Sequence, residues 1–155
     1  KSCFFAGIYV TKLTRTHQTA APLAAHLGMT PVQDPDLHEV HLGEWDGGLY
    51  RIKAAEGDPI YRKVLQTQDW SAIPGAETRE AFFGRVERGL LRIASAHSDR
   101  RVAGFVHGGV IGAAMAMASK SEPFAFLGAA NGSISRLVIH EGRMIVRGFN
   151  DTSHL

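Results

Sequence analysis

The chain has 155 residues, 45% of them apolar, which is enough for one domain with a substantial hydrophobic core. A formal net charge of +2 is too small to indicate a nucleic acid partner. The single cysteine, Cys3, excludes an internal disulfide and a cysteine-based zinc site, and favours a reducing, cytoplasmic location.

The first apolar run, residues 3–10, is too short to cross a bilayer, which takes roughly 20 residues, so we expect no membrane partner. Residues 6–11 are short, apolar and β-branched at the end, and this pattern predicts a strand. Residues 15–27 keep apolar side chains at helical spacing, and Gly28 is a typical stop signal. The sequence therefore predicts a strand followed directly by a helix.

The central third of the chain has three different patterns. Residues 37–43 alternate, which predicts a strand on which Glu39 faces away from Val40 and Leu42. Residues 49–75 hold helix-breaking residues and two aromatic–basic clusters, so we expect short helices outside the sheet, as a lid insertion. Residue Thr78 can cap a helix through His97, with one apolar face made by Phe82, Val86, Leu90 and Ile93.

The last third repeats the strand–helix pattern and then ends in a hairpin. Residues 101–106 predict a buried strand, residues 107–109 a tight turn, and residues 110–118 a helix of small side chains. Two alternating runs, residues 133–139 and 143–149, are joined by a Glu-Gly turn typical of a hairpin. We therefore expect one α/β domain over residues 1–155. Its expected architecture is a three-layer sandwich, with a mostly parallel central sheet and helices on both faces.

Ligands of such sheets bind at the carboxyl ends of the strands, where Arg15 and His107 are expected. Arg15 begins a helix, where a guanidinium can help backbone N–H groups hold a phosphoryl group; an exposed helix-start arginine is the alternative. His107 precedes two glycines that let a ligand approach, although a core or turn histidine is an equal alternative. Glu39 is a candidate general acid if cations lie near it, and otherwise a solvated strand residue.

Several cofactor and metal motifs are absent from the 155 residues. The sequence has no phosphate-binding Gly-x-x-x-x-Gly-Lys loop, no dinucleotide Gly-x-Gly-x-x-Gly pattern and no His-Glu-x-x-His metal motif. We therefore expect neither a nucleotide cofactor nor a metalloprotease helix.

Segments along nearly the whole chain resemble the histidine phosphatase superfamily, the phosphoglycerate mutase-like group. Residues 8–20 resemble its segment of a strand followed by Ser-x-Leu-x-Arg-Ala/Thr-x-x-Thr-Ala, with Thr11 in place of serine. Residues 37–47 are similar to its Leu-x-Glu-x-x-x-Gly-x-Trp-Glu-Gly segment, and residues 106–111 to its second active-site histidine turn. Two further parts of the resemblance are residues 73–78 with Arg85-Val86, and residues 131–135 with 149–155.

The resemblance implies a phosphomonoesterase that acts on a small phosphorylated metabolite through a phosphohistidine. In this scheme Arg15 and Gly108 bind the phosphate, His107 stabilises charge, and Glu39 protonates the leaving oxygen and then activates water. No metal or cofactor is required. Arg51 and Arg62 are candidate substrate residues of the lid.

The sequence departs from the family at the nucleophile, because no Arg-His-Gly triplet occurs in it. The chain starts at Lys1, and we expect the nucleophile upstream of it, on an interior strand followed by a helix that this chain lacks. Loss of that strand would leave neighbouring strand edges unpaired, and such edges are consistent with a homodimer. Because the nucleophile is missing, the chain alone should be inactive.

The sequence is also compatible with two other functions. One is a phosphoglycerate mutase, although a lid with Arg51 and Arg62 but no paired arginines favours hydrolysis. The other is an inactive phosphate-binding or interaction module, which a true absence of the nucleophile would favour.

Overall fold

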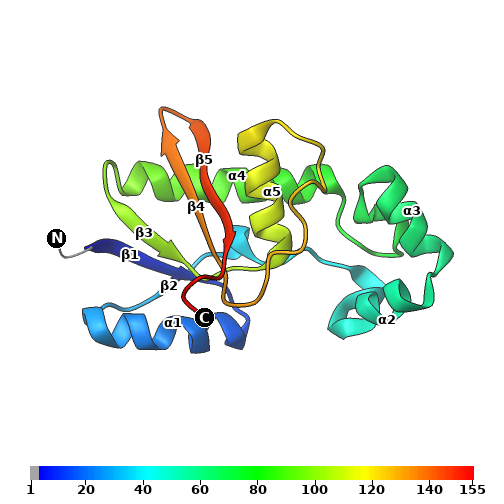
Figure 1. The fold of residues 1–155 in the computed structure, drawn as a ribbon, viewed down its shortest axis with the longest axis horizontal. Helices are drawn as coiled ribbons and strands as arrows, with labels where there is room; N and C mark the ends of the chain where they lie inside the picture. Colours follow the sequence, from blue (N-terminus) through cyan, green and yellow to red (C-terminus); the bar gives the residue numbers. More distant parts are fainter. Residues whose placement is uncertain (1–3) are drawn as a thin grey trace.

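The computed structural model describes residues 4–155 (Figure 1). The strands are β1 (Phe5–Val10), β2 (Val32–Gln33), β3 (Arg101–Gly104), β4 (Ile134–His140) and β5 (Arg143–Asp151). The α-helices are α1 (Thr14–Leu27), α2 (Leu49–Glu56), α3 (Pro59–Thr67), α4 (Arg79–Ala96) and α5 (Gly108–Ser119). Short 3-10 segments are η1 (Pro35–Leu37), η2 (Gly43–Gly48) and η3 (Trp70–Ala72).

The strands form a parallel sheet and a separate hairpin. The sheet has the order β2-β1-β3, with Tyr9 beside Val32 on one neighbour and Gly104 on the other. Strands β4 and β5 pair antiparallel around a turn in which Glu141 and Gly142 both have positive φ. This geometry is the one that a two-residue hairpin turn needs, and it confirms the predicted hairpin.

Alternation along β1 determines which helix covers each face of the sheet. Ile8 and Val10 are buried with Ala20 and Ala24 of α1 on one side. Tyr9, between them, packs on the other side, in the cluster that contains α4 and α5 (Figure 1). Successive side chains of a strand point to opposite faces, so β1 has a helix layer on each side. The predicted three-layer α/β architecture is confirmed.

The larger core lies on the α4 and α5 side of the sheet. Thr78 caps α4 by accepting a hydrogen bond from the Ala81 N–H at 3.1 Å, as its sequence predicts. The buried residues of this core come from both helices and from the segments before α4: Leu37, Val40, Trp45, Val64, Trp70, Ile73, Phe82, Val86, Ile93, Val110 and Ala113.

The strand predicted over residues 37–43 is wrong. That stretch leaves η1 at Leu37, runs without regular structure, and enters η2 at Gly43. Leu37 and Val40 are both buried, a spacing of three that does not fit a strand. The backbone carbonyls of Asp36, His38 and Glu39 accept hydrogen bonds from the Arg85 guanidinium, so they do not pair with a strand.

The other differences from the sequence prediction are small. Strand β3 ends at Gly104 rather than at residue 106, and α5 begins at Gly108 rather than at residue 110. Residues 49–75 form short helices, as predicted, and α2 and α3 project at one end of the molecule (Figure 1). A lid role for them stays a prediction. Among residues 4–155, no helix is both long enough and apolar enough to cross a membrane.

Candidate functional site

The candidate site lies where β1 and β3 end. Thr11 follows β1 directly, and Arg15 is in the first turn of α1. His107 follows β3 and is the N-cap of α5, with an extended backbone that places it before the helix. The two parallel strands end at the same edge of the sheet, so residues that are distant in the sequence meet there.

His107 is held between a hydroxyl and a guanidinium. The side chain of Arg15 donates from Nη2 to Nδ1 of His107 at 3.1 Å, and Oγ1 of Thr11 lies 2.9 Å from Nε2. Because arginine can only donate, Nδ1 accepts and Nε2 carries the proton of the neutral ring. Burial and the Arg15 charge lower the pKa of His107 to about 4, so the ring is neutral near pH 7.

Glu39 lies beside the start of α5. Its carboxylate accepts hydrogen bonds from the backbone N–H of Val40 at 3.0 Å and of Gly109 at 3.2 Å. Burial raises the pKa of Glu39 although these N–H groups and nearby arginines oppose the rise. A carboxyl group with a raised pKa is suited to donate and recover a proton.

Arg85 of α4 holds the segment that carries Glu39. Its guanidinium is mostly buried and binds both oxygens of Glu77, at 2.7 and 2.8 Å. It also donates to the backbone carbonyls of Asp36, His38 and Glu39, at 2.7 to 3.0 Å. The planar fork of arginine can satisfy all of these acceptors at once, whereas a lysine ammonium cannot. Sequence reasoning noted Arg85 only within a motif and assigned it no role.

His38 is a second residue that sequence reasoning did not select for the site. Its Nδ1 donates to the carbonyl of Glu39 at 3.0 Å, while its buried Nε2 has no hydrogen-bond partner among the described residues. Its ring stacks on His41 at 5.1 Å and lies 6.0 Å from the ring of His107, centroid to centroid. Folding of residues 38–42 outside any strand brings His38 to the site, and the strand interpretation concealed this.

The structure brings together only some of the residues selected from the sequence. Arg15, Glu39 and His107 meet, and Gly108 starts α5 at a position where an added Cβ would meet no described atom within 4 Å. Arg51 of α2 and Arg62 of α3 lie on the projecting helices instead (Figure 1), where the Arg62 guanidinium approaches Gly57.

Chemically, this arrangement suits a phosphoryl dianion. The N-terminus of α5 and the Arg15 guanidinium supply positive charge on either side of His107, whose Nδ1 accepts from Arg15 and whose single N–H, at Nε2, faces Thr11. A protonated Glu39 beside them can give its proton to an oxygen that leaves phosphorus. Among residues 4–155, no group of three or more histidine, cysteine or acidic side chains is arranged to hold a metal ion.

The sequence is similar to phosphatases and mutases. The sequence model described as histidine phosphatase superfamily (branch 1) matches residues 1–152. A metal-independent phosphoserine phosphatase of Arabidopsis thaliana is 30% identical over 152 residues, or 96% of this chain and 63% of that protein. Phosphoglycerate mutase-like protein 4 of the same plant is 32% identical over 106 residues, or 67% of this chain and 46% of the relative. The chain thus spans about half to two thirds of these two curated relatives.

Solved structures show the same fold. Phosphoglycerate mutase from Bacillus anthracis str. Sterne superposes with a TM-score of 0.78 at 24% identity, covering 98% of this chain and 75% of that one. The mycobacterial glucosyl-3-phosphoglycerate phosphatase, in complex with inorganic phosphate, has a TM-score of 0.77 at 27% identity, covering 97% and 79%.

Proposed function

Because this chain belongs to branch 1 of the histidine phosphatase superfamily, we propose that the protein is a phosphomonoesterase that acts through a phosphohistidine intermediate. The single observation that carries the proposal is the contact of Arg15 with His107, 3.1 Å apart, at the N-terminus of α5 and beside Glu39. Arg15 and His107 would bind the phosphate of a small phosphorylated metabolite, with the backbone N–H of Gly108 completing the site.

In the first chemical step, a histidine nitrogen attacks phosphorus and the bond from phosphorus to the ester oxygen breaks. The leaving oxygen takes the electron pair of that bond and a proton from Glu39. Arg15 and His107 stabilise the charge on the equatorial oxygens, which is where phosphoryl transfer gains most of its catalysis.

In the second step, Glu39 as a carboxylate removes a proton from water, and the hydroxide oxygen attacks phosphorus. The bond from phosphorus to nitrogen then breaks, which releases inorganic phosphate and restores the histidine. The raised pKa of Glu39 suits both steps, because the group must be protonated in one and basic in the next.

The nucleophile belongs, in this proposal, to a strand upstream of residue 1. Within residues 4–155, β3 pairs only with β1 and β4 only with β5, so β3 has an edge available for a further strand. A parallel strand on that edge would end beside β3, and a histidine after it would lie next to His107. The coding sequence upstream tests this directly: an Arg-His-Gly triplet supports it, and its absence contradicts it.

Hydrolysis is favoured over a mutase reaction. A mutase must retain its phosphorylated product and return the phosphate to it, which calls for cationic groups around the site. Arg51 and Arg62, the candidate substrate residues of the lid, come from two different helices, α2 and α3, at one end of the molecule (Figure 1), and residues 49–75 contain no pair of adjacent arginines.

The decisive experiment uses the full-length protein with p-nitrophenyl phosphate. We expect hydrolysis, and a phosphoprotein trapped by rapid quenching that is stable to alkali and labile to acid, as a phosphohistidine is. His107→Ala and Arg15→Ala should each lower turnover about 100-fold or more, as loss of a charge-stabilising donor does.

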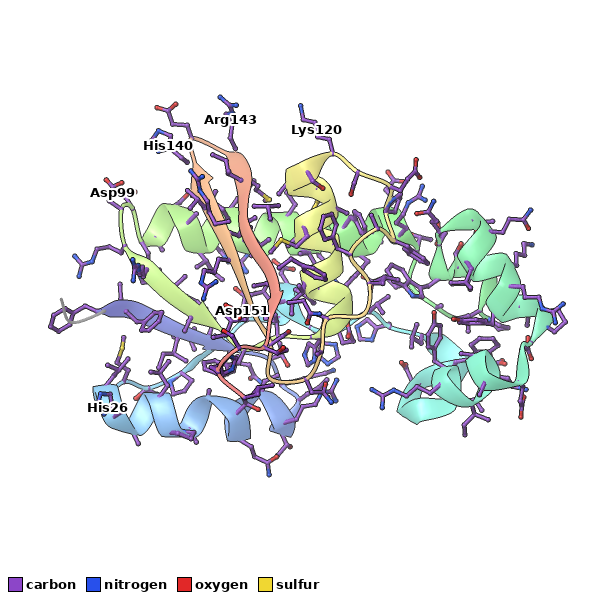
Figure 2. The ribbon with its side chains drawn as sticks, viewed as in Figure 1. His26, Asp99, Lys120, His140, Arg143 and Asp151 are labelled. Carbon is purple, nitrogen blue, oxygen red and sulfur yellow. The ribbon has the colours of Figure 1, made fainter. Side chains whose placement is uncertain are left out.

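A matched control is His26→Ala. His26 is exposed in the last turn of α1, at the end opposite to Arg15 (Figure 2), so its loss should leave turnover unchanged. Near-normal turnover in His107→Ala would overturn the assignment of the site, and a phosphoprotein stable to acid would overturn the phosphohistidine.

A further inference from the structure

Thr11 is a buried polar residue that has no role in the mechanism above. It follows β1 directly, at the edge of the sheet where the candidate site lies, and its side chain is fully buried. Its Oγ1 lies 2.9 Å from Nε2 of His107, the ring nitrogen that does not contact Arg15. A buried hydroxyl costs free energy unless it is hydrogen-bonded, so its partners show what it contributes.

The hydroxyl protons around Thr11 have one consistent arrangement. Thr16 donates its single hydroxyl proton to the backbone carbonyls of Leu13 at 2.8 Å and Thr11 at 3.2 Å. The Oγ1 of Thr16 can therefore only accept from Oγ1 of Thr11, which is 3.5 Å away. The Thr11 oxygen in turn accepts from the Leu13 N–H at 3.3 Å and from Nε2–H of His107. The hydroxyl thus binds the histidine as an acceptor and not as a donor.

An acceptor at Nε2 leaves Nδ1 as the ring nitrogen that faces the proposed phosphate site. In the free protein Nδ1 accepts a hydrogen bond from Arg15 at 3.1 Å and carries no proton. A ring in this state has no N–H for a phosphate oxygen, whereas a ring that takes a second proton, at Nδ1, has one. Arg15 is exposed, so its guanidinium can turn from Nδ1 to a bound phosphate and leave that nitrogen free.

The charges around His107 determine when the second proton is bound. Burial lowers the pKa of the ring to about 4, and positive or titratable groups near it act in the same direction. These are Arg15 of α1, His38 of the segment between η1 and η2, and Arg85 of α4. Glu39 is the acidic group beside the start of α5. A dianion next to the ring opposes the surrounding positive charge and attracts a proton from water to Nδ1.

We propose that Thr11 is a positioning residue: it holds Nε2–H of His107, so that the ring takes a second proton at Nδ1 when phosphate binds and donates a hydrogen bond from there to a phosphate oxygen. This inference rests on the proposed function and goes beyond it, because it assigns the proton state in which His107 acts. Without the hydroxyl, the charged ring would keep an unpaired N–H in a buried place, which costs more than an unpaired neutral one.

The test is a pH titration of the His107 ring by nitrogen NMR in the full-length protein, with and without sulfate. Sulfate is a tetrahedral dianion that carries no proton over this pH range, so any proton taken up belongs to the protein. His107→Ala identifies the ring signals, and Glu39 has no nitrogen that could be confused with them. We expect saturating sulfate to raise the pKa of His107 from about 4 to about 6 in wild type, the effect of an opposite charge in contact.

Thr11→Val removes the hydroxyl and keeps the shape of the side chain. We expect a smaller rise of the His107 pKa with sulfate, a sulfate Kd about fivefold higher at a pH between the two values above, and turnover of p-nitrophenyl phosphate about tenfold lower. Thr11→Ser keeps the hydroxyl and should restore all three, although loss of a buried methyl lowers its melting temperature. Thr19→Val is the matched control, because it removes an exposed hydroxyl that donates to the Arg15 carbonyl in α1, and it should behave as wild type.

The possible results separate this inference from the proposed function. An equal rise of the His107 pKa in wild type and Thr11→Val, or a serine variant as impaired as the valine one, would overturn the role of Thr11. So would a wild-type pKa that saturating sulfate does not move. In each of these cases, hydrolysis of p-nitrophenyl phosphate by wild type leaves the phosphatase proposal intact. Absence of that hydrolysis, together with no binding of sulfate, would overturn the proposed function and this inference with it.

Discussion

The backbone N–H of Gly109 donates a hydrogen bond to Oε2 of Glu39 at 3.2 Å, although the two residues are 70 positions apart. A Cβ atom on residue 109 would overlap the other carboxylate oxygen of Glu39. Glycine is thus needed here for close approach rather than for its backbone conformation, since its φ is not positive. The first turn of α5 therefore leaves just enough room for the Glu39 carboxylate to pack against its backbone.

Gly109→Ala should therefore reduce activity with little effect on folding. The added methyl displaces the Glu39 carboxylate, and we expect kcat on an alkyl phosphate to fall about tenfold or more. Gly84→Ala is the control, because Gly84 lies exposed in α4 and a Cβ there meets no atom within 4 Å. Steady-state kinetics and thermal melting of both variants provide the measurement. Full activity in Gly109→Ala would show that the position of Glu39 does not matter.

Replacing Glu39 by glutamine should have an effect that depends on the leaving group. An alkoxide needs a proton as it leaves, so we expect turnover of an alkyl phosphate such as glycerol phosphate to fall about 100-fold. A nitrophenolate leaves without a proton, and the loss on p-nitrophenyl phosphate should be much smaller. Equal losses on the two substrates in parallel assays would argue against the acid role.

The sequence predicted the parts of the site that follow regular elements. Arg15 and His107 each lie where a strand passes into a helix, and the local pattern of apolar residues and glycines was sufficient to place both. The surroundings of Glu39 could not be obtained in this way. Its segment alternates like a strand, but its conformation depends on Arg85, which is 46 positions away and binds its backbone. Long-range contacts of this kind leave no local periodicity.

The same reason explains why His38 was not selected. Its neighbours in the sequence suggest only a strand residue beside a glutamate, whereas its position 6.0 Å from His107 arises from tertiary packing. The family resemblance supplied the role expected for Glu39, whereas no motif in the sequence pointed to His38.

The low pKa of His107 makes a prediction about stability and pH. The folded-state pKa of about 4 lies below the ordinary value of 6.5, so between these pH values the unfolded chain binds a proton that the folded chain does not. The contribution of this group is therefore fully present above pH 6.5 and is lost as the pH falls toward 4. Urea unfolding at several pH values should show wild type losing more stability over this interval than His107→Gln. Parallel curves for the two proteins would contradict the low pKa.

Arg85→Lys should lower both the stability and the activity of the protein, even though lysine keeps the positive charge. Lysine cannot bind Glu77 and three backbone carbonyls together, which leaves buried acceptors unsatisfied. We expect a loss of about 1–3 kcal/mol in the free energy of unfolding, the range for unsatisfied buried groups, and a lower kcat because Glu39 is less well positioned. Arg143→Lys, on the exposed end of β5, is the control (Figure 2). Unfolding curves that coincide with wild type would show that the network is dispensable.

Gly43, two residues before Trp45, should be required for steric reasons as well as for its backbone conformation. Gly43 has a φ of +57°, and a Cβ on it would overlap backbone atoms of Pro74, Gly75 and Ala76. Backbone cannot move aside as a flexible side chain can, and the Glu44 N–H donates to the Pro74 carbonyl at 3.0 Å across the same contact. Gly47 has a similar φ of +74°, but a Cβ there meets nothing within 4 Å.

The two glycines separate the effects of conformation and contact. Gly47→Ala should cost about 1 kcal/mol of unfolding free energy, the cost of a left-handed conformation alone. Gly43→Ala should cost about 2–4 kcal/mol, because the segment that leads to α4 must also move away. Denaturant unfolding of both variants measures the difference. If the two substitutions destabilise equally, the contact with residues 74–76 contributes nothing, and only the positive φ requires glycine at position 43.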